Sequence, residues 1–183
     1  RIELHAGVCG GIGMNRMRML TRILGGLHDE AGRVTIPGFY DDVADLPPTV
    51  AADWARLGFD ADAFLGAVGL SRPAGEQGRS GLEMIWSRPT AEINGISGGY
   101  TGAGFKTVLP SEARAKVSFR LVADQDPDKI RAAFRGWVTA QLPEDCRVAF
   151  HAHGGDAASR MDISAPAFDI ARTALSAEWP GEA

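Results

Sequence analysis

The sequence contains few cysteines, no long apolar run and no concentration of basic residues. Its two cysteines, Cys9 and Cys146, are too few and too far apart for a disulfide scaffold or a metal-binding knuckle, so we expect reduced thiols in a cytoplasmic protein. No apolar stretch is long enough to span a bilayer, and the first residues lack the pattern of a signal peptide. The 19 lysines and arginines are dispersed and the net charge is -4, which argues against nucleic-acid binding. We therefore expect neither a membrane nor a nucleic acid as partner.

The composition is typical of a folded domain, and the two ends of the chain indicate a piece of a longer protein. Of the 183 residues, 45% are hydrophobic and 23% are charged, which is enough apolar material for one core. The chain opens on Arg1 within a strand pattern, without an initiator methionine, and stops at Ala183 just after a helical pattern. We expect the rest of the protein to hold another domain.

Strand and helix patterns alternate along the chain. Strand patterns cover residues 1–8, 90–96, 106–109, 112–122 and 147–151. One helical pattern runs from about Met17 to His28, and a second begins at Asp126 as N-cap with Pro127 in the first turn. This order predicts an α+β fold, a ferredoxin-like two-layer sandwich in which a four-stranded antiparallel sheet carries two helices on one face.

Two segments fall outside this sandwich. Residues 33–89 are punctuated by prolines and contain short helical patterns at 49–57 and 61–68, so we interpret them as an insertion with irregular and helical structure. Beyond Gly154 a polar connector leads to a capped helix that begins at Ser164. That helix has no partner in the sandwich. We therefore predict one domain at 1–153, and in 154–183 a connector and helix of a different domain.

A glycine-rich loop precedes the most regular strand of the chain. Residues 98–104 include several glycines, whose backbone amides can approach a ligand closely. In the strand that follows, period-two alternation places Val117 and Phe119 on an apolar face and Arg120 on the opposite face. A glycine-rich loop next to an outward-pointing arginine favours recognition of a small anion.

Three segments together resemble the lid, or dimerisation, domain of carnosinase-type dipeptidases. They are residues 4–11 (LHAGVCGG), 33–40 (RVTIPGFY), and 102–110 (GAGFKTVLP) with 117–122 (VSFRLV). These dipeptidases belong to the superfamily of zinc-dependent aminoacylases, deacylases and exopeptidases. The resemblance covers most of residues 1–153. It implies that 154–183 are the first part of the return into a catalytic domain.

The resemblance implies a metal-dependent amide hydrolase in which this chain is an accessory domain. The lid interrupts a catalytic domain with two divalent metal ions, expected to be zinc, and two lids associate in a homodimer. The implied substrates are dipeptides or N-acyl amino acids. The chain has neither a His-X-Asp pair nor an adjacent Glu-Glu pair, the motifs of the superfamily's metal site. The sequence therefore predicts an enzyme for the parent protein, no cofactor in this chain, and no activity for residues 1–183 alone.

Five residues are matched to functional positions by the resemblance. His5 matches the lid histidine that enters the partner subunit's active site and stabilises the oxyanion of the tetrahedral intermediate. Arg120 matches the arginine that holds the terminal carboxylate of the substrate. Thr107 matches a hydroxyl contact in the same pocket, and the loop that contains Gly102 and Gly104 can bring backbone amides near that carboxylate.

Other interpretations remain open at this point. The chain departs from the family pattern at Ala6 and Cys9, which affects the expected substrate preference more than the role of His5. A free-standing ferredoxin-like module that binds a ligand or regulates another protein has no catalytic partner. A thiol enzyme built on His5 and Cys9 lacks an orienting acid. His151 and His153 share a strand face, but no further ligand completes a metal site.

Overall fold

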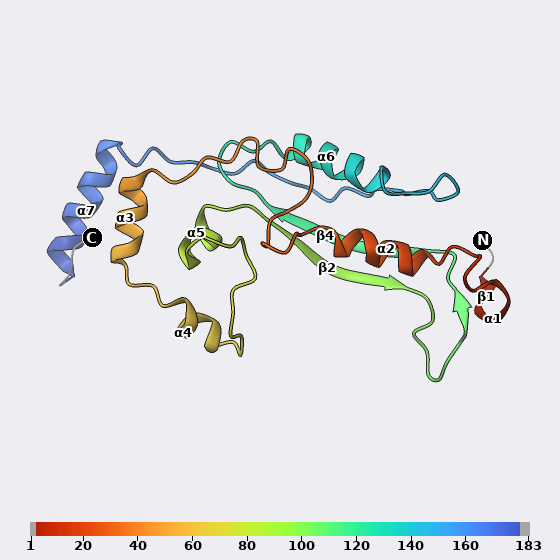
Figure 1. Cartoon of the computed structure of the whole chain (residues 1–183). Helices are drawn as coiled ribbons and strands as arrows, with labels where there is room; N and C mark the ends of the chain where they lie inside the picture. Colours follow the sequence, from red (N-terminus) through yellow and green to blue (C-terminus); the bar gives the residue numbers. More distant parts are fainter. Residues whose placement is uncertain (1–2, 180–183) are drawn as a thin grey trace.

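Two antiparallel pairs of strands organise the chain in the computed structural model, which describes residues 3–179 (Figure 1). Strand β2 (Thr90–Gly98) pairs with β4 (Ala113–Arg120), and the two-residue strand β1 (Leu4–His5) pairs with β3 (Val108–Leu109). Helices and antiparallel strands are thus combined in one chain. The predicted α+β class is confirmed.

The β2–β4 pair follows the alternation that the sequence predicted for β4. Ala115, Val117 and Phe119 are half-buried on one face, while their neighbours, including Arg120, are exposed on the other. The register runs from Thr90 opposite Arg120 to Gly98 opposite Ala113, with a shift between Ile93 and Gly95. Arg120 therefore occupies the very end of this sheet.

Two longer helices accompany the β2–β4 pair. Helix α2 (Arg16–Gly25) begins after Asn15, whose side chain accepts hydrogen bonds from the amides of the first turn, and it contacts β4. Helix α6 (Pro127–Thr139) begins after Asp126 with Pro127 at its first position, as the sequence predicted. The ring of Phe134 on α6 lies 5.3 Å from that of Phe119 on β4. This contact holds α6 against the apolar face of the sheet.

The core lies where α6, β2 and the segment after α2 meet. Its fully buried members are aliphatic or aromatic and come from all three parts of the chain: Leu27, Val34, Ile36, Phe39, Ala91 and Ile130. Partly buried residues of β4 and α6 pack against this cluster. The segment that follows α2 therefore contributes four of these six side chains, and the regular elements contribute two.

The predicted four-stranded sheet is not confirmed, because the described residues form two separate two-stranded sheets. No strand is assigned at 147–151, where Phe150 instead packs its ring against Phe134 at 6.2 Å. The expected strand at 1–8 is reduced to Leu4–His5, and its first two residues lie outside the described part. Helix α1 (Ala6–Cys9) follows immediately, because the His5 side chain caps it.

Short helices occupy the inserted segment. Helices α3 (Pro48–Arg56) and α4 (Ala61–Gly66) agree with the two helical patterns, whereas α5 (Gly81–Trp86) was not predicted. Helix α7 (Pro166–Glu178) begins after Ala165 instead of at Ser164, and it contains no buried residue. Within residues 3–179, no helix combines the length and the apolar character that crossing a membrane would require.

Candidate functional site

The side chains of His5 and Thr107 meet at the edge of the smaller sheet. His5 is the last residue of β1, and Thr107 immediately precedes β3. The Nε2 atom of His5 lies 3.4 Å from Oγ1 of Thr107, and both residues are exposed. The amide of Ala6 donates to the carbonyl of Thr107 at 2.9 Å, which extends the ladder by one bond. The structure thus joins two of the predicted site residues.

The other ring nitrogen of His5 has a backbone partner. The amide of Gly7 donates to Nδ1 at 3.1 Å, which makes His5 the N-cap of helix α1. A nitrogen that accepts a hydrogen bond carries no proton in the neutral imidazole, so the proton is on Nε2. That nitrogen faces Thr107 and the solvent. The neutral ring therefore presents an N–H donor outward.

Charged groups flank this pair on the same small sheet. The Nζ atom of Lys106 donates to Oε2 of Glu3 at 2.8 Å, and this hydrogen bond raises the pKa of Lys106 above its ordinary value. Both side chains are exposed, so the pair adds little to stability. Lys106 nevertheless keeps a positive charge next to Thr107.

The glycine-rich loop leads into β3 beside Thr107. The hydroxyl of Tyr100 donates to the carbonyl of Ala103 at 2.8 Å, so the ring folds back across the loop. A Cβ at Gly102 would lie 2.6 Å from the Tyr100 hydroxyl oxygen, so a larger residue there would displace the Tyr100 ring. Gly104 has φ of 77°, a conformation that favours glycine. Phe105, next in sequence, is fully exposed.

Arg120 lies at the end of β4 that is remote from His5. Figure 1 shows β1 and β3 near the place where β4 begins, whereas β4 finishes toward the middle of the molecule. Because a strand advances about 3.3 Å per residue, the eight residues of β4 place Arg120 about 23 Å from the start of the strand. The structure does not bring Arg120 together with His5 and Thr107. Within one chain, the predicted site residues therefore form two groups.

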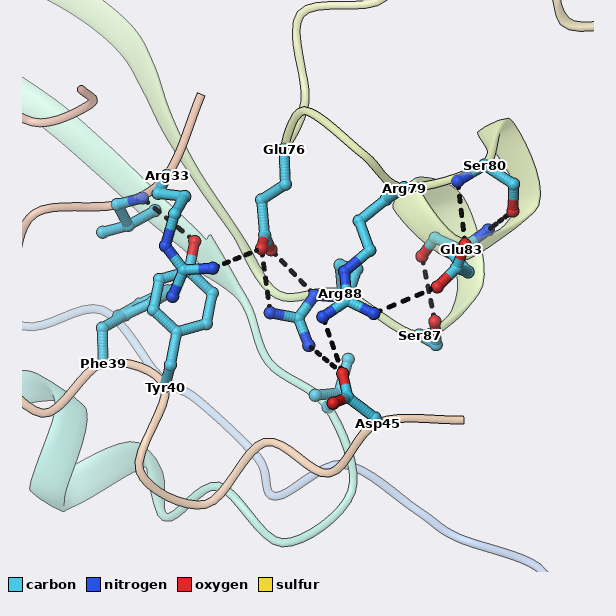
Figure 2. Close-up of polar contacts among 12 residues, drawn as sticks. Arg33, Phe39, Tyr40, Asp45, Glu76, Arg79, Ser80, Glu83, Ser87 and Arg88 are labelled. Carbon is cyan, nitrogen blue, oxygen red and sulfur yellow. Dashed lines mark hydrogen bonds and ion pairs between the residues drawn. The ribbon is translucent and has the colours of Figure 1, made fainter. Parts of the chain in front are cut away.

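A cluster of charged side chains near that end of the sheet was not predicted (Figure 2). Glu76 is 5% exposed and Arg88 is 7% exposed. Nε and Nη2 of Arg88 donate to the two carboxylate oxygens of Glu76 at 2.8 and 2.9 Å, and Nη1 of Arg33 donates to Oε2 at 3.1 Å. A paired arrangement of this kind fixes both the position and the orientation of the guanidinium.

The ring of Tyr40 packs against the two arginines of this cluster. The guanidinium carbon of Arg33 lies 4.3 Å from the centre of its ring, and that of Arg88 lies 5.2 Å from it. The hydroxyl of Tyr40 accepts a hydrogen bond from the amide of Val34 at 3.0 Å. Burial raises the pKa of Tyr40 above its ordinary value. The phenol therefore stays neutral between two cations.

The charged cluster continues to the surface through a third arginine, Arg79. Nη2 of Arg79 donates to Oδ1 of Asp45 at 2.6 Å, and Nη1 of Arg79 donates to Oε1 of Glu83 at 3.2 Å. The hydrogen bond from Arg79 lowers the pKa of Asp45. Glu83 also closes a capping box with Ser80 at the start of α5. The cluster thus ties the beginning of the inserted segment, around Tyr40, to its end, around Arg88.

The described residues offer no metal site. Within 3–179, no three His, Cys, Asp or Glu side chains lie together as metal ligands would. Cys9 and Cys146 are both free thiols. A hollow of about 260 Å³ beside α4 and α5 is lined by Leu57, Phe59, Phe64, Leu82, Ile85 and Trp86. None of those side chains titrates, so this hollow has no group for acid–base catalysis.

The sequence is similar to a known peptidase family and to curated dipeptidases. Residues 2–146 match the M20 family described as the peptidase dimerisation domain. The Cys-Gly metallodipeptidase DUG1 of Candida albicans is 32% identical over 128 residues, which are 70% of this chain and 26% of that protein. The Beta-Ala-His dipeptidase of Homo sapiens is 30% identical over 120 residues, which are 66% of this chain and 24% of that protein.

Solved structures of similar proteins lead to the same group. The M20 family metallo-carboxypeptidase Sso-CP2 from Sulfolobus solfataricus superposes with a TM-score of 0.82 at 27% identity, covering 98% of this chain and 40% of that one. The dipeptidase Dug1p from Saccharomyces cerevisiae superposes with a TM-score of 0.66 at 29% identity, covering 76% and 29%. This chain therefore spans well under half the length of each of these proteins.

Proposed function

The chain belongs to the M20 peptidase dimerisation domain family, and from that membership we propose that it is the dimerisation and substrate-clamping domain of a metal-dependent dipeptidase or N-acyl amino acid hydrolase. In this proposal residues 1–153 form the lid, and residues 154–183 lead back toward a catalytic domain. The relatives named as Cys-Gly metallodipeptidase and Beta-Ala-His dipeptidase support an amide bond between small amino acid units as the bond cleaved.

The observation that carries the proposal is the exposed pair of His5 and Thr107. Hydrolysis of an amide passes through a tetrahedral intermediate whose oxygen carries negative charge. The Nε2–H of His5 and the hydroxyl of Thr107 lie 3.4 Å apart and are both exposed, so together they can donate hydrogen bonds to that oxygen. The cap contact from Gly7 to Nδ1 keeps the required nitrogen protonated in the neutral ring.

Arg120 is proposed to bind the terminal carboxylate of the substrate. Its guanidinium is exposed at the end of β4, and a planar fork of donors suits a carboxylate. A dipeptide spans about 7 Å, whereas the ends of β4 are about 23 Å apart. One substrate molecule therefore cannot contact His5 and Arg120 of the same chain. This separation supports a homodimer in which each active site receives His5 and Thr107 from one subunit and Arg120 from the other.

The hydrolytic chemistry itself is proposed to lie outside this sequence. Membership of the family implies divalent metal ions, which the resemblance identifies as two zinc ions that activate a water molecule. The residues described here do not fit such a site, since no cluster of metal ligands exists among residues 3–179. The role of this chain is to bind and orient the substrate and to donate hydrogen bonds to the oxygen of the tetrahedral intermediate. We propose no cofactor for the chain itself.

The test uses the complete peptidase that carries this chain, supplied with divalent metal and assayed on dipeptides and N-acyl amino acids. We expect His5→Ala to lower kcat by about 10²-fold or more with little change in KM. We expect Arg120→Ala to raise KM by roughly 30-fold, because the variant loses the hydrogen-bonded ion pair between the guanidinium and the substrate carboxylate. Arg114→Ala is the matched control, because Arg114 lies on the same exposed face of β4 and pairs with Glu112. Wild-type kinetics in both site variants would contradict the proposal.

A further inference from the structure

We propose that the buried carboxylate of Glu76 is a positioning residue for substrate binding: through Arg88 and Tyr40 it fixes the end of the sheet from which Arg120 projects. The inference rests on the proposed function of Arg120 as the carboxylate-binding group. It assigns a functional role to the inserted segment, because both Glu76 and Arg88 lie within residues 33–89. Glu76 itself does not contact the substrate in this proposal.

The first connection runs along the backbone. Arg88 is held at both its Nε and Nη2 atoms by Glu76, and its side chain is almost fully buried. Two residues later the chain enters β2 at Thr90, which is paired with Arg120 in the sheet. A terminal pair of a two-stranded sheet has no further ladder beyond it to hold it in place. The clamp on Arg88 supplies that support at the end where Arg120 needs it.

The second connection runs through packed aromatic rings. The Arg88 and Arg33 guanidiniums both lie over Tyr40, and the Tyr40 and Phe39 rings are 5.2 Å apart at their centres. Phe39 in turn lies 5.9 Å from Phe119, the residue before Arg120. Phe39 is 1% exposed and cannot shift without disturbing the core. A displacement of the charged cluster would therefore also shift the end of β4 through the contacts from Tyr40 to Phe39 and from Phe39 to Phe119.

The charges of the cluster explain why Glu76 is the residue on which it depends. Glu76 receives hydrogen bonds from both Arg33 and Arg88, and Figure 2 shows its carboxylate between the two guanidiniums. Without its negative charge, the two guanidiniums above one ring would repel each other, and Arg88, which is buried, would have little water to screen its charge. We expect them to separate, and the start of β2 to move with Arg88. A clamp on a carboxylate is sensitive to shifts of about 1 Å.

The experiment measures kcat and KM in the complete, metal-loaded peptidase for four proteins: wild type, Glu76→Gln, Arg120→Ala and the double variant. We expect Glu76→Gln to raise KM about fivefold with kcat within about twofold of wild type. In the double variant, KM should equal that of Arg120→Ala alone, because no guanidinium is left to position. Loss of folded protein would lower the apparent kcat and leave KM unchanged, so this pattern separates positioning from general destabilisation.

A matched control removes an acid from the same inserted segment. Asp53→Asn breaks the exposed pair with Arg56 on α3, and we expect wild-type KM. If Glu76→Gln does not fold, Arg88→Lys keeps the charge, removes the paired donors and should raise KM about threefold. A wild-type KM in the folded Glu76 or Arg88 variant, with KM raised in Arg120→Ala, would overturn the inference and leave the proposed function standing. A wild-type KM in Arg120→Ala would overturn both.

Discussion

The Nε2 atom of His5 lies 3.4 Å from Oγ1 of Thr107, although 102 positions separate the two residues in the sequence. Both side chains are exposed, and neither is joined to Arg120 within the chain. Two donors that converge at an exposed edge are arranged for a ligand supplied by another surface.

The hydroxyl of Thr107 should contribute to turnover together with His5. We expect Thr107→Val in the complete peptidase to lower kcat by about tenfold, less than the loss expected for His5→Ala. The double variant should be no slower than His5→Ala alone, because the two groups act on the same oxygen. Steady-state kinetics on a dipeptide give kcat for the two single variants and the double variant. Thr101→Val, in the same exposed loop, serves as control, and a fully multiplicative loss in the double variant would argue against a shared target.

Mixed dimers should test whether the two groups of site residues come from different subunits. In a dimer of one His5→Ala and one Arg120→Ala subunit, one active site receives both wild-type residues and the other receives neither. After random exchange of equal amounts, about half of the dimers are mixed, so about a quarter of wild-type activity should return. Activity is measured at a substrate concentration well below KM, before and after exchange of the two impaired proteins. No recovery, with exchange verified, would mean that each active site takes both residues from a single subunit.

Gln125 should be important for stability. It is 2% exposed, donates to the carbonyl of Phe39 at 2.7 Å and accepts from the amide of Val122 at 2.9 Å. Gln125→Leu leaves both backbone groups without these partners, so we expect it to lower the free energy of unfolding by about 3 kcal/mol. Chemical denaturation of the chain measures the change. The control is Gln141→Leu, because Gln141 is exposed just beyond the end of α6 and donates to the carbonyl of Trp137. We expect it to lower the free energy of unfolding by less than about 0.5 kcal/mol. Equal losses in the two variants would show that burial of Gln125 is not the cause.

The Tyr100 ring should determine the tolerance of position 102. A Cβ at Gly102 would lie 2.6 Å from the Tyr100 hydroxyl oxygen and 2.8 Å from Cζ. We expect Gly102→Ala to displace the ring, distort the loop beside Thr107 and raise KM about threefold. Adding Tyr100→Ala should restore KM, since the obstruction is gone. Gly136→Ala, which meets open space in α6, is the control. If Tyr100→Ala does not restore the KM of Gly102→Ala, the contact between the new Cβ and the Tyr100 ring is not the cause of the raised KM.

The capping box of α5 should give the chain a pH-dependent contribution to stability. The amide of Ser80 donates to Glu83 at 2.8 Å and holds the pKa of Glu83 below its ordinary value of 4.5. A carboxyl with a lowered folded-state pKa stabilises the fold above pH 4.5, and this stability is lost as pH falls through the folded-state pKa. We expect Glu83→Gln to remove about 1 kcal/mol at pH 7 and to flatten the acid side of the stability curve. An unchanged curve in Glu83→Gln would contradict this assignment.

Features that depend on neighbouring residues were predictable from the sequence. The exposure of Arg120 follows from the two-residue period of β4, which the backbone imposes on any strand. The start of α6 follows from Asp126 and Pro127, whose preference for these positions is local. The positions of α3 and α4 agree with apolar spacing for the same reason.

Features that depend on distant contacts were not predictable. Glu76 and Arg88 have the charged side chains of ordinary surface residues, and only the fold shows that they are buried against Tyr40. The strand pattern at the start of the chain is interrupted because the amide of Gly7 binds the His5 ring and turns the backbone into α1. The position of Thr107 beside His5, away from Arg120, depends on the β1–β3 pairing.

The β1–β3 ladder joins only two residue pairs, yet it closes a loop of about a hundred residues. So short a ladder has few backbone hydrogen bonds with which to oppose the entropy of the open loop. We expect this edge to open and reclose repeatedly while the core around Leu27 stays folded, and its amides to exchange with solvent deuterium early. The imidazole of His5 therefore belongs to a segment whose amides are poorly protected from hydrogen exchange. Contact with a second protein surface would hold this segment, and with it the imidazole, in one position.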